Sequence, residues 1–568
     1  MDEKPQNKLQ NIAAFLADPL ISSLILVHPN RLPEPAFTVP TQWRDWWDAS
    51  NRSLLDWLAL LRYSEKVQRG GHTENATTPL SLRWAIDSAI RLQLPRNINV
   101  PCSGISDDDS LSVRHESRQS PHTVLPGHAS PKSNSQKQSP GAYGMSPKKE
   151  HEVTQMINYI SELISSSQSL SDVRHVVDVG SGQGYLSRAL RDTLHLNVLA
   201  VDGDDHQTQG AERRAEKVKK RAGRGKAPEQ RVSDSIGSLT HKTIRINSET
   251  LRYAVDEWIS QQEADRSVPV LIVALHACGS LTPDILRSGD HKWTLAGAVV
   301  VGCCYNLMSE PDFPLSQSLA TSSHRPSLKL YRSQACTLCD CDPAPYIDHS
   351  TRPCSAHNLV LTEHHVQLAA QVPSQWTRTD QALHAAELAM RKVVYRALLG
   401  RWVGLLEGKE SDSVRRRPAA DSESRDGKGT DPQGSRLKQP LDLPPNATSS
   451  LPEARLRVRL GKLNDTAYSD WATFLRMASE KTGIVFPEEA FHDPEAVLRR
   501  RLEILYMMRC LLGPVVESVI LLDRLLWMEE QLDGGADVRL VNLFDQAMGS
   551  GRNVAIVIAP RNGSAVEI

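Results

Sequence analysis

This sequence of 568 residues lacks net charge, because its 66 lysines and arginines are balanced by 67 aspartates and glutamates. The overall field of such a protein does not attract nucleic acid, so any binding of that kind requires a local basic patch. Composition alone therefore excludes a generally basic nucleic-acid binder and identifies no partner.

An apolar N-terminus and an uninterrupted apolar run are also missing. The first ten residues, MDEKPQNKLQ, are polar where a secretory signal is apolar. The most apolar stretch contains Glu517, Asp523 and Arg524, which disfavour a membrane span. Nine cysteines in short runs, without such a signal, are typical of reduced thiols. We therefore expect a soluble cytoplasmic or nuclear protein without a membrane partner.

The length predicts two or three domains, or one domain with large insertions. Two polar segments with few large apolar residues cannot repay the entropy of ordering and are predicted to be disordered linkers. The expected divisions are an N-terminal helical region 1–95, a linker 96–142, an α/β core 143–374 with a basic insertion 205–240, a helical insertion 375–532 with a linker 407–450, and a strand hairpin 533–568.

The N-terminal region carries tryptophans at helical spacing. The residues near one predicted helical face are Trp43, Trp47, Leu54, Trp57, Leu58 and Leu61. The stripe is either a buried face or a surface for stacking bases. The large apolar area of tryptophan favours the buried face.

The core alternates helical segments with short runs of β-branched residues. HVVDVG, NVLAVDG, VPVLIVALHACG and LAGAVVVGCCY are continuously apolar, as in strands of a parallel sheet that is covered on both faces. VRLVNLFD and NVAIVIAP predict an antiparallel hairpin at the edge of the sheet. The sequence therefore predicts an α/β fold that the C-terminus completes.

The sharpest motif is VVDVGSGQGYLSRAL, in which a predicted strand ends at Asp178 and three glycines lead into a helix. Glycines at these positions let the backbone turn tightly and approach a ligand. A dinucleotide fingerprint needs its third glycine one position later, where Tyr185 stands. The next predicted strand ends at Asp202, whose carboxylate can accept hydrogen bonds from both hydroxyls of a ribose. The alternative is a glycine-rich turn in which Asp202 caps a helix.

The D-x-G-x-G-x-G pattern resembles the loop of class I S-adenosylmethionine-dependent methyltransferases. The resemblance implies that S-adenosyl-L-methionine is the cofactor, with the loop under its methionine portion and Asp202 at its ribose. Asp178 would orient the loop or meet the ammonium group of the cofactor. The expected cofactor-binding residues are Asp178, Gly180, Ser181, Gly182, Gly184, Asp202 and Gly203.

Two later strands should bring further residues to the same place. Ligands of open α/β sheets gather at the carboxyl ends of the strands. The residues at the two predicted strand ends are His276, Cys278, Cys303, Cys304 and Tyr305.

Several stretches, in order, resemble the methyltransferase-like protein 25 family, which includes the ribosomal RNA adenine dimethylase domain-containing proteins. They are MSPKKEHEV, VDVGSGQGYLSRAL, ALHACGSLTPDIL, VVGCCYNL, LLGPVVESVILLDRLLWMEE, and LFD followed by GRN. The resemblance covers most of the chain outside the linkers. It implies a Rossmann-like class I methyltransferase sheet of seven strands, with the last hairpin antiparallel and a large helical insertion. The H-x-C-G and C-C pair also resembles motifs of tRNA ribose 2'-O-methyltransferases, which points towards RNA.

The catalytic candidates are His276, Cys278 and Tyr305. HACG does not provide the Asn- or Asp-Pro-Pro-aromatic motif that holds an amine, so the sequence does not support adenine dimethylation. His276 can remove a proton from a hydroxyl or ring nitrogen, or it can bond a neighbouring carbonyl at a strand end. Tyr305 can stack on a base or pack against the sheet. For Cys303 and Cys304, apolar packing is favoured over a nucleophilic role.

Three further features have two interpretations each. Cys336, Cys339, Cys341 and Cys354 can bind zinc, but their spacing departs from paired knuckles and favours free thiols, so we expect no metal. Lys148 and Lys149 can reach a phosphate or a carboxylate, or they form a solvated first turn. The basic stretch 212–231 can contact RNA phosphates or be a flexible charged loop.

The sequence therefore predicts a methyltransferase that uses S-adenosyl-L-methionine and acts on RNA, either ribosomal or transfer RNA. We expect no DNA partner, and the oligomeric state stays open. A protein methyltransferase that recruits its substrate through the Trp-rich region is one alternative. A non-catalytic scaffold that retains the fold is another.

Overall fold

We describe a computed structural model of the chain. The residues that it describes are 3–29, 43, 46, 56–71, 78–96, 145–211, 213, 237–262, 268–288, 293–319, 359–415, 460–492 and 496–561. Three predictions lie outside these residues: most of the 96–142 and 407–450 linkers, most of the basic stretch, and the cysteines at 336, 339, 341 and 354.

The chain divides into two compact units. Unit 1 comprises 1–26, 57–382 and 507–568, and unit 2 comprises 27–56 and 383–506. These boundaries differ from the predicted divisions, because most of the N-terminal helical region and the end of the predicted helical insertion belong with the sheet. The reason is burial: most residues of the long helix from Met507 onwards are buried inside unit 1.

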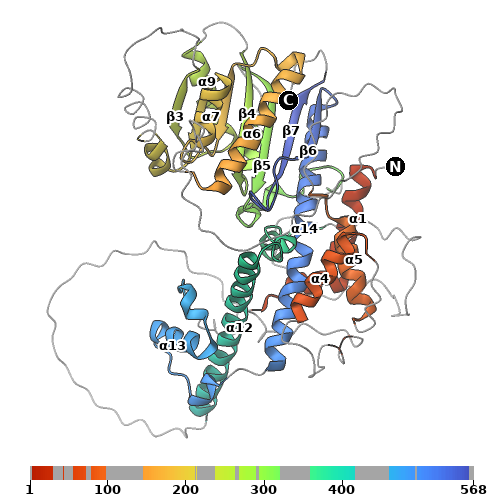
Figure 1. The fold of residues 1–568 in the computed structure, drawn as a ribbon, viewed down its shortest axis with the longest axis vertical. Helices are drawn as coiled ribbons and strands as arrows, with labels where there is room; N and C mark the ends of the chain where they lie inside the picture. Colours follow the sequence, from red (N-terminus) through yellow and green to blue (C-terminus); the bar gives the residue numbers. More distant parts are fainter. Residues whose placement is uncertain are drawn as a thin grey trace, which may run out of the picture. The chain divides into compact units, whose positions relative to one another are not determined.

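Unit 1 contains a seven-stranded sheet (Figure 1). Its strands are β1 (His175–Val179), β2 (Asn197–Asp202), β3 (Leu239–Thr243), β4 (Val268–Cys278), β5 (Trp293–Cys303), β6 (Ala536–Asn542) and β7 (Val554–Pro560). Its helices are α1 (Pro5–Ala17), α2 (Pro19–Leu26), α4 (Asp56–Gln68), α5 (Leu80–Leu92), α6 (Pro147–Ser166), α7 (Tyr185–Leu194), α9 (Ser248–Ser260), α10 (Leu281–Leu286) and α11 (Glu363–Leu368). Asp56 is assigned to unit 2, so α4 starts at the boundary.

The strand order is β3-β2-β1-β4-β5-β7-β6, and the first five strands are parallel. β7 pairs antiparallel with both β5 and β6. This arrangement confirms the predicted Rossmann-like α/β sheet with an antiparallel last hairpin. The order reverses between β1 and β4, which makes their carboxyl ends the topological switch point of the sheet.

Both faces of the sheet are buried. Leu271, Val273 and Leu275 of β4 pack with the apolar residues of α6 and α7 in one core cluster. Val270 and Ile272, which alternate with them and therefore face the other side, are equally buried. Continuous apolar strands are required for this double cover, as the sequence predicted.

The sequence did not predict the strand β3, because β3 is not an apolar run. Its residues, LTHKT, are mostly polar and none is fully buried, because β3 pairs only with β2 at the edge of the sheet. The chain is also helical from Asp205 to Ala211. The predicted basic insertion 205–240 is therefore too long at both ends, where the described residues belong to the fold.

The predicted buried face of the N-terminal region is confirmed where it is described. Trp57, Leu58 and Leu61 are buried in unit 1, and Trp43 is buried in unit 2. Trp47 and Leu54 lie outside the described residues. The buried tryptophans are therefore core residues and not a stacking surface.

The helix α14 (Ala496–Leu532) is long and apolar enough to cross a membrane, but 83% of its most apolar window is buried within the molecule. Two of its charged residues, Glu517 and Asp523, are buried and paired in unit 1. Glu517 accepts a hydrogen bond from Arg96 at 2.7 Å, and Asp523 accepts from the backbone N–H of Leu315 at 2.9 Å. These partners show how a core helix retains the charges that interrupt its apolar run. The bent pair α1 and α2 passes the same test of length and composition.

Unit 2 is helical in its described part. It contains most of α12 (Asp380–Arg415), α13 (Trp471–Thr482) and the beginning of α14. Tyr395 of α12 packs edge-on against Trp471, with ring centroids 5.5 Å apart, and near Phe474. Trp471 donates its indole N–H to the carbonyl of Ala490 at 2.7 Å. An aromatic cluster therefore forms the core of this unit.

Candidate active site

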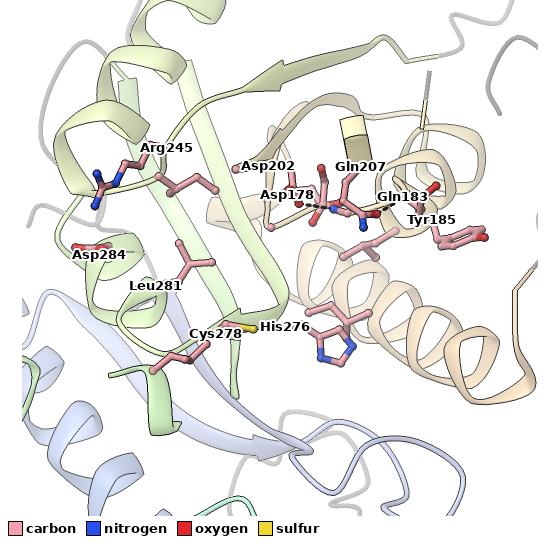
Figure 2. Close-up of a pocket in the computed structure, with 18 of the residues that line it drawn as sticks. Asp178, Gln183, Tyr185, Asp202, Gln207, Arg245, His276, Cys278, Leu281 and Asp284 are labelled. Atoms are coloured by element: carbon pink, nitrogen blue, oxygen red, sulfur yellow. Dashed lines mark hydrogen bonds between the residues drawn. The ribbon is translucent and has the colours of Figure 1, made fainter. Parts of the chain in front are cut away.

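A cavity of about 930 Å³ lies in unit 1 at the carboxyl ends of the parallel strands (Figure 2). Its lining includes six of the seven predicted cofactor residues; Gly184 is the exception. Two of the three predicted catalytic residues, His276 and Cys278, also line it. The volume is within the range of small-molecule sites. The strand order thus brings together residues that are almost 100 positions apart in the sequence.

The glycine loop between β1 and α7 lines the cavity with its backbone. Gly180 and Gly182 have φ angles of 73° and 55°, in the left-handed region that other residues rarely adopt. The N–H groups of Gly180 and Ser181 both donate to the carbonyl of Val201, at 2.8 and 3.1 Å. These bonds fix the loop to the end of β2. Gly184, with φ of 66°, is the N-cap of α7, so its role is to start the helix.

Asp202 is held by the loop that precedes it and by the turn that follows. Its Oδ2 accepts the N–H of Gly182 at 2.7 Å, and its Oδ1 accepts the N–H of Asp204 at 2.8 Å. Each carboxylate oxygen retains a second lone pair. The side chain is therefore oriented at the cavity with acceptor capacity left for two hydroxyls.

Asp178 lies beneath the loop at the end of β1. Its side chain is 2% exposed and accepts a hydrogen bond from the hydroxyl of Ser187 at 2.5 Å. Burial raises the pKa of Asp178 to about 6, although the Ser187 hydrogen bond and Lys149 act in the opposite direction. At neutral pH this carboxylate is mostly ionised, and burying its charge destabilises the fold. A cation bound next to it would reduce this destabilisation.

His276 lies in the irregular part of β4 between Ala274 and Ala277, and its Nε2 lies 3.1 Å from Oε2 of Glu152 on α6. The Glu152 side chain is 1% exposed and the His276 side chain 32% exposed. Burial raises the pKa of Glu152, but the hydrogen bond and charge of His276, with Lys149, outweigh it and place the pKa below its usual range. When Nε2–H donates to this carboxylate, Nδ1 of His276 is left as an acceptor. This pair joins two motifs, MSPKKEHEV and HACG.

Three thiols meet beside His276. Cys278 ends β4, Cys303 ends β5 and Cys304 directly follows it, so neighbouring strands bring the three together. The sulfur of Cys278 lies 3.3 Å from that of Cys303. The hydrogen bond of Cys303 lowers the pKa of the Cys278 thiol to about 6, against the effect of partial burial. The same contact, together with burial, raises the pKa of Cys303.

The structure corrects the third catalytic candidate. Tyr305 is fully buried, and its hydroxyl donates to Oε1 of Glu517 at 3.2 Å. The Arg524 guanidinium lies 5.6 Å from its ring centroid. Because Tyr305 packs against α14 and does not line the cavity, it supports the site from behind. Of the two alternatives in the sequence, packing is the one observed.

Several cavity residues had no signal in the sequence. Arg245 follows β3, Gln207 lies in the short helix after β2, and Asp284 lies on α10. Figure 2 shows Arg245 and Asp284 on one side of the cavity and Gln207 with Gln183 on the other. Arg245 could not be assigned because the polar strand before it was not recognised. The Lys149 ammonium, which the MSPKKEHEV motif did suggest, lines the cavity, and burial lowers its pKa.

Comparison with known proteins concerns this same segment. Residues 148–311 match the family described as "Methyltransferase domain". This segment is therefore similar to methyltransferase domains. The chain is also similar to "Probable methyltransferase-like protein 25" of Homo sapiens, at 45% identity over 76 residues, and of Mus musculus, at 43% over 76 residues. Each match covers 13% of this chain and 12% of the relative. The predicted resemblance to that family is confirmed within these limits.

Proposed function

We propose that this protein is a methyltransferase that uses S-adenosyl-L-methionine and acts on RNA. The observation that best supports this cofactor is the hydrogen bond from Gly182 N–H to Asp202. It joins the glycine loop to the acid at the end of β2, beside the switch point of the sheet, in the segment that is similar to methyltransferase domains. The general rule for open α/β sheets places ligands in that crevice.

The side chains of the cavity fit the chemical groups of this cofactor. Asp202 offers acceptor positions for the two ribose hydroxyls, and Asp178 offers a buried negative charge for the ammonium group. Gly182 has nothing within 4 Å of the position that a Cβ would occupy, so the loop leaves open space on the cavity side. Lys149 and Arg245 supply positive charge for a carboxylate or a phosphate.

The bound cofactor would supply the methyl group, and the residues of the chain would position the acceptor. His276 is the group that can take the proton of a hydroxyl or ring nitrogen, with Nδ1 as the acceptor and Glu152 holding Nε2–H. The buried Glu152 carboxylate also stabilises the imidazolium that results, as in other carboxylate–histidine pairs. Alignment of the nucleophile contributes most of the remaining acceleration.

Two features support RNA as the substrate. The stretch 212–231 contains nine basic and three acidic residues, and it begins five residues after Gln207, which lines the cavity. Basic segments of this kind bind phosphates without reading sequence. The likeness of HACG and the Cys-Cys pair to RNA methyltransferase motifs agrees with this choice. The lack of an amine-holding motif favours a hydroxyl or a ring atom over an exocyclic amine.

The test is transfer of a labelled methyl group to extracts of cells that lack the gene. The full chain is incubated with methyl-labelled S-adenosyl-L-methionine and total RNA or total protein, before and after treatment with ribonuclease or protease. We expect ribonuclease-sensitive label with the wild type and none with Asp202→Ala. Mass spectrometry of the RNA nucleosides then identifies the methylated atom.

Three outcomes would contradict this proposal. Label that resists ribonuclease and is lost with protease would make the protein a protein methyltransferase. Binding of S-adenosyl-L-methionine without transfer to either fraction would favour a scaffold. Equal labelling by Asp202→Ala would place the cofactor elsewhere.

We also propose that the protein works in the cytosol or the nucleus. In the described part of the chain, the cysteines at 278, 303, 304 and 510 are thiols rather than disulfides. Thiols of this kind are typical of reducing compartments.

A further inference from the structure

We propose that Cys278, Cys303 and Cys304 bind a thiophilic d¹⁰ metal ion, Zn²⁺ in the first place, at the edge of the cavity. The sequence favoured packing for Cys303 and Cys304 and predicted no metal site. The site lies beyond the proposed methyl transfer, because metal binding does not depend on the cofactor or on the substrate.

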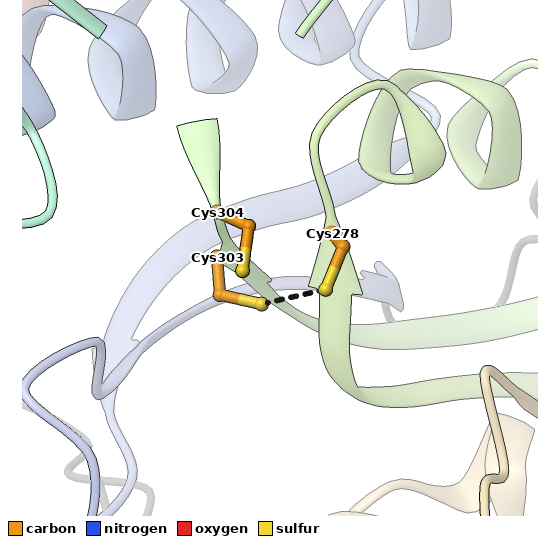
Figure 3. A group of neighbouring side chains, drawn as sticks. All are labelled: Cys278, Cys303 and Cys304. Atoms are coloured by element: carbon orange, nitrogen blue, oxygen red, sulfur yellow. Dashed lines mark hydrogen bonds between the residues drawn. The ribbon is translucent and has the colours of Figure 1, made fainter. Parts of the chain in front are cut away.

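The first argument is the distance between the sulfur atoms. All three lie within 4.8 Å of one another, and those of Cys278 and Cys303 are 3.3 Å apart. A Zn–S bond of about 2.3 Å in tetrahedral geometry requires sulfurs separated by roughly 3.8 Å. The 3.3 Å separation is within about 0.5 Å of this value, and no pair of these sulfurs is more than 4.8 Å apart, so small rotations of the side chains suffice. Figure 3 shows the three sulfurs converging between the ends of β4 and β5.

The second argument is the backbone at Cys304. Adjacent residues of a strand project to opposite faces, so Cys303 and Cys304 would not both approach Cys278 in a regular strand. Cys304 has a φ of 48°, a left-handed conformation that is uncommon for a residue other than glycine. The strand ends at Cys303, and this turn brings the second thiol to the same side. Strained conformations of this kind persist where the surrounding structure requires them, and they cluster at functional sites.

The third argument is access. Cys303 is buried, Cys304 is partly exposed, and Cys278 is exposed and lines the cavity. A metal ion can therefore reach the sulfurs from the cavity. Three soft thiolates select Zn²⁺ or Cu⁺ over Mg²⁺ and Ca²⁺, which prefer oxygen ligands. Three protein ligands also leave a fourth position for water or for a donor atom of the substrate, as in catalytic zinc sites.

The experiment measures metal content of the full chain. The protein is purified under reducing conditions, incubated with Zn²⁺ and dialysed, and its bound metal is counted by plasma mass spectrometry. We expect about one ion per chain in the wild type and loss of most of it in Cys278→Ser and in Cys304→Ser. Cys510→Ala, a change of a buried cysteine of α14, is the matched control and should retain the ion.

A second control separates this site from the other cysteine cluster of the chain. Serine at positions 336, 339, 341 and 354 together should leave the ion in place. X-ray absorption at the zinc edge of the wild type should give three sulfur ligands and one lighter atom. This measurement needs no variant, so it tests zinc binding by three sulfurs even if a substitution prevents folding.

The following results would overturn the proposal. The first is that the reduced wild type binds neither Zn²⁺ nor Cu⁺. The second is that Cys278→Ser and Cys304→Ser retain the ion, or that the variant of the four later cysteines loses it. The third is a coordination shell of four sulfurs in the X-ray absorption spectrum. Titration with S-adenosyl-L-methionine, run on the same samples, keeps failure of the metal site distinct from failure of the methyltransferase proposal.

Discussion

His276 is the residue whose role depends most on a neighbour that the sequence did not identify. Glu152 lies 124 positions earlier, is 1% exposed, and contacts Nε2 of His276 at 3.1 Å. Its other oxygen, Oε1, is buried without a hydrogen-bond partner among the described residues. A buried carboxylate with one partner depends on that partner, so Glu152 and His276 should act as a pair.

The first prediction concerns this pair. In Glu152→Gln the amide can still contact His276, but the protonated imidazole loses its counter-charge. We expect methyl transfer to fall about tenfold or more and the acidic limb of the pH–rate profile to move to lower pH. His276→Ala should lower the rate by about 10²–10⁴.

The matched control for this prediction is Glu150→Gln, which changes the same residue type two positions earlier on α6. It should leave both the rate and the profile unchanged. A Glu152→Gln profile that keeps its shape while its rate falls would mean that Glu152 has only a structural role.

Asp178 gives a second prediction at the residue scale. Because burial raises its pKa from 3.8 to about 6, the folded chain holds this proton more tightly than the unfolded chain. The group therefore stabilises the fold below about pH 4, and this stabilisation is lost as the pH rises through about 6. Asp178→Asn removes the cost of the buried charge. We expect it to raise the free energy of unfolding at pH 7.5 by about 1–3 kcal/mol.

Urea unfolding of the wild type and of Asp178→Asn at pH 7.5 and at pH 4 measures this effect. The difference between the two proteins should be present at pH 7.5 and small at pH 4. The variant should also bind S-adenosyl-L-methionine more weakly, because the ammonium group loses its negative partner. A variant that is destabilised at pH 7.5 would show that ionised Asp178 stabilises the fold.

At the scale of elements, α14 combines an apolar surface with buried charges. Glu517 accepts from Arg96 at 2.7 Å and from the hydroxyl of Tyr305 at 3.2 Å. Burial raises the pKa of Glu517, although Arg96 opposes this. The Tyr305 contact fixes the segment that directly follows β5 and the thiols. One buried carboxylate therefore connects α14 to the end of β5.

The third prediction is that Glu517→Ala destabilises unit 1 by about 3–5 kcal/mol, because it leaves the buried Arg96 without this partner. Denaturant unfolding followed by circular dichroism measures it. Glu529→Ala, at an exposed position on the same helix, is the control and should cost less than about 1 kcal/mol. Equal effects of the two substitutions would contradict the account.

The sequence predicted elements where burial dictated their composition. The four apolar runs and the C-terminal hairpin became strands, since buried strands must be continuously apolar. The edge strand β3 was not recognised, because LTHKT pairs on one side only and needs no apolar face. Arg245, which follows it in the cavity, was missed for the same reason.

The candidate site shows the same division. The glycine loop and Asp202 were predictable because local backbone geometry requires those residue types. The contact of Glu152 with His276 and the convergence of the three thiols depend on which elements are neighbours in the fold. The local sequence does not show which elements these are. Tyr305 was placed wrongly because a tyrosine after a strand end is compatible with both a cavity and a core.

At the scale of the whole molecule, a nearly neutral protein must attract RNA through a limited region. The stretch 212–231 is the basic segment nearest in sequence to the cavity residues Asp202 and Gln207. The fourth prediction is that serine in place of its nine lysines and arginines weakens RNA binding about tenfold or more and flattens its dependence on salt. The affinity for S-adenosyl-L-methionine should not change.

Filter binding of RNA at several salt concentrations measures this effect. Serine at positions 415–417, three consecutive arginines at the start of the other polar segment, is the control and should leave RNA binding close to that of the wild type. Unchanged RNA binding by the first variant would mean that this segment does not recruit the substrate.

The central claim is that the cavity at the carboxyl ends of β1, β2 and β4 binds S-adenosyl-L-methionine. Calorimetric titration of the full chain tests it most directly, with Asp202→Ala as the variant and Asp205→Ala, an exposed acid three positions later, as the control. The account predicts one site per chain in the wild type and in Asp205→Ala, and loss of binding in a folded Asp202→Ala. No binding by the folded wild type, or equal affinity in all three proteins, would contradict it.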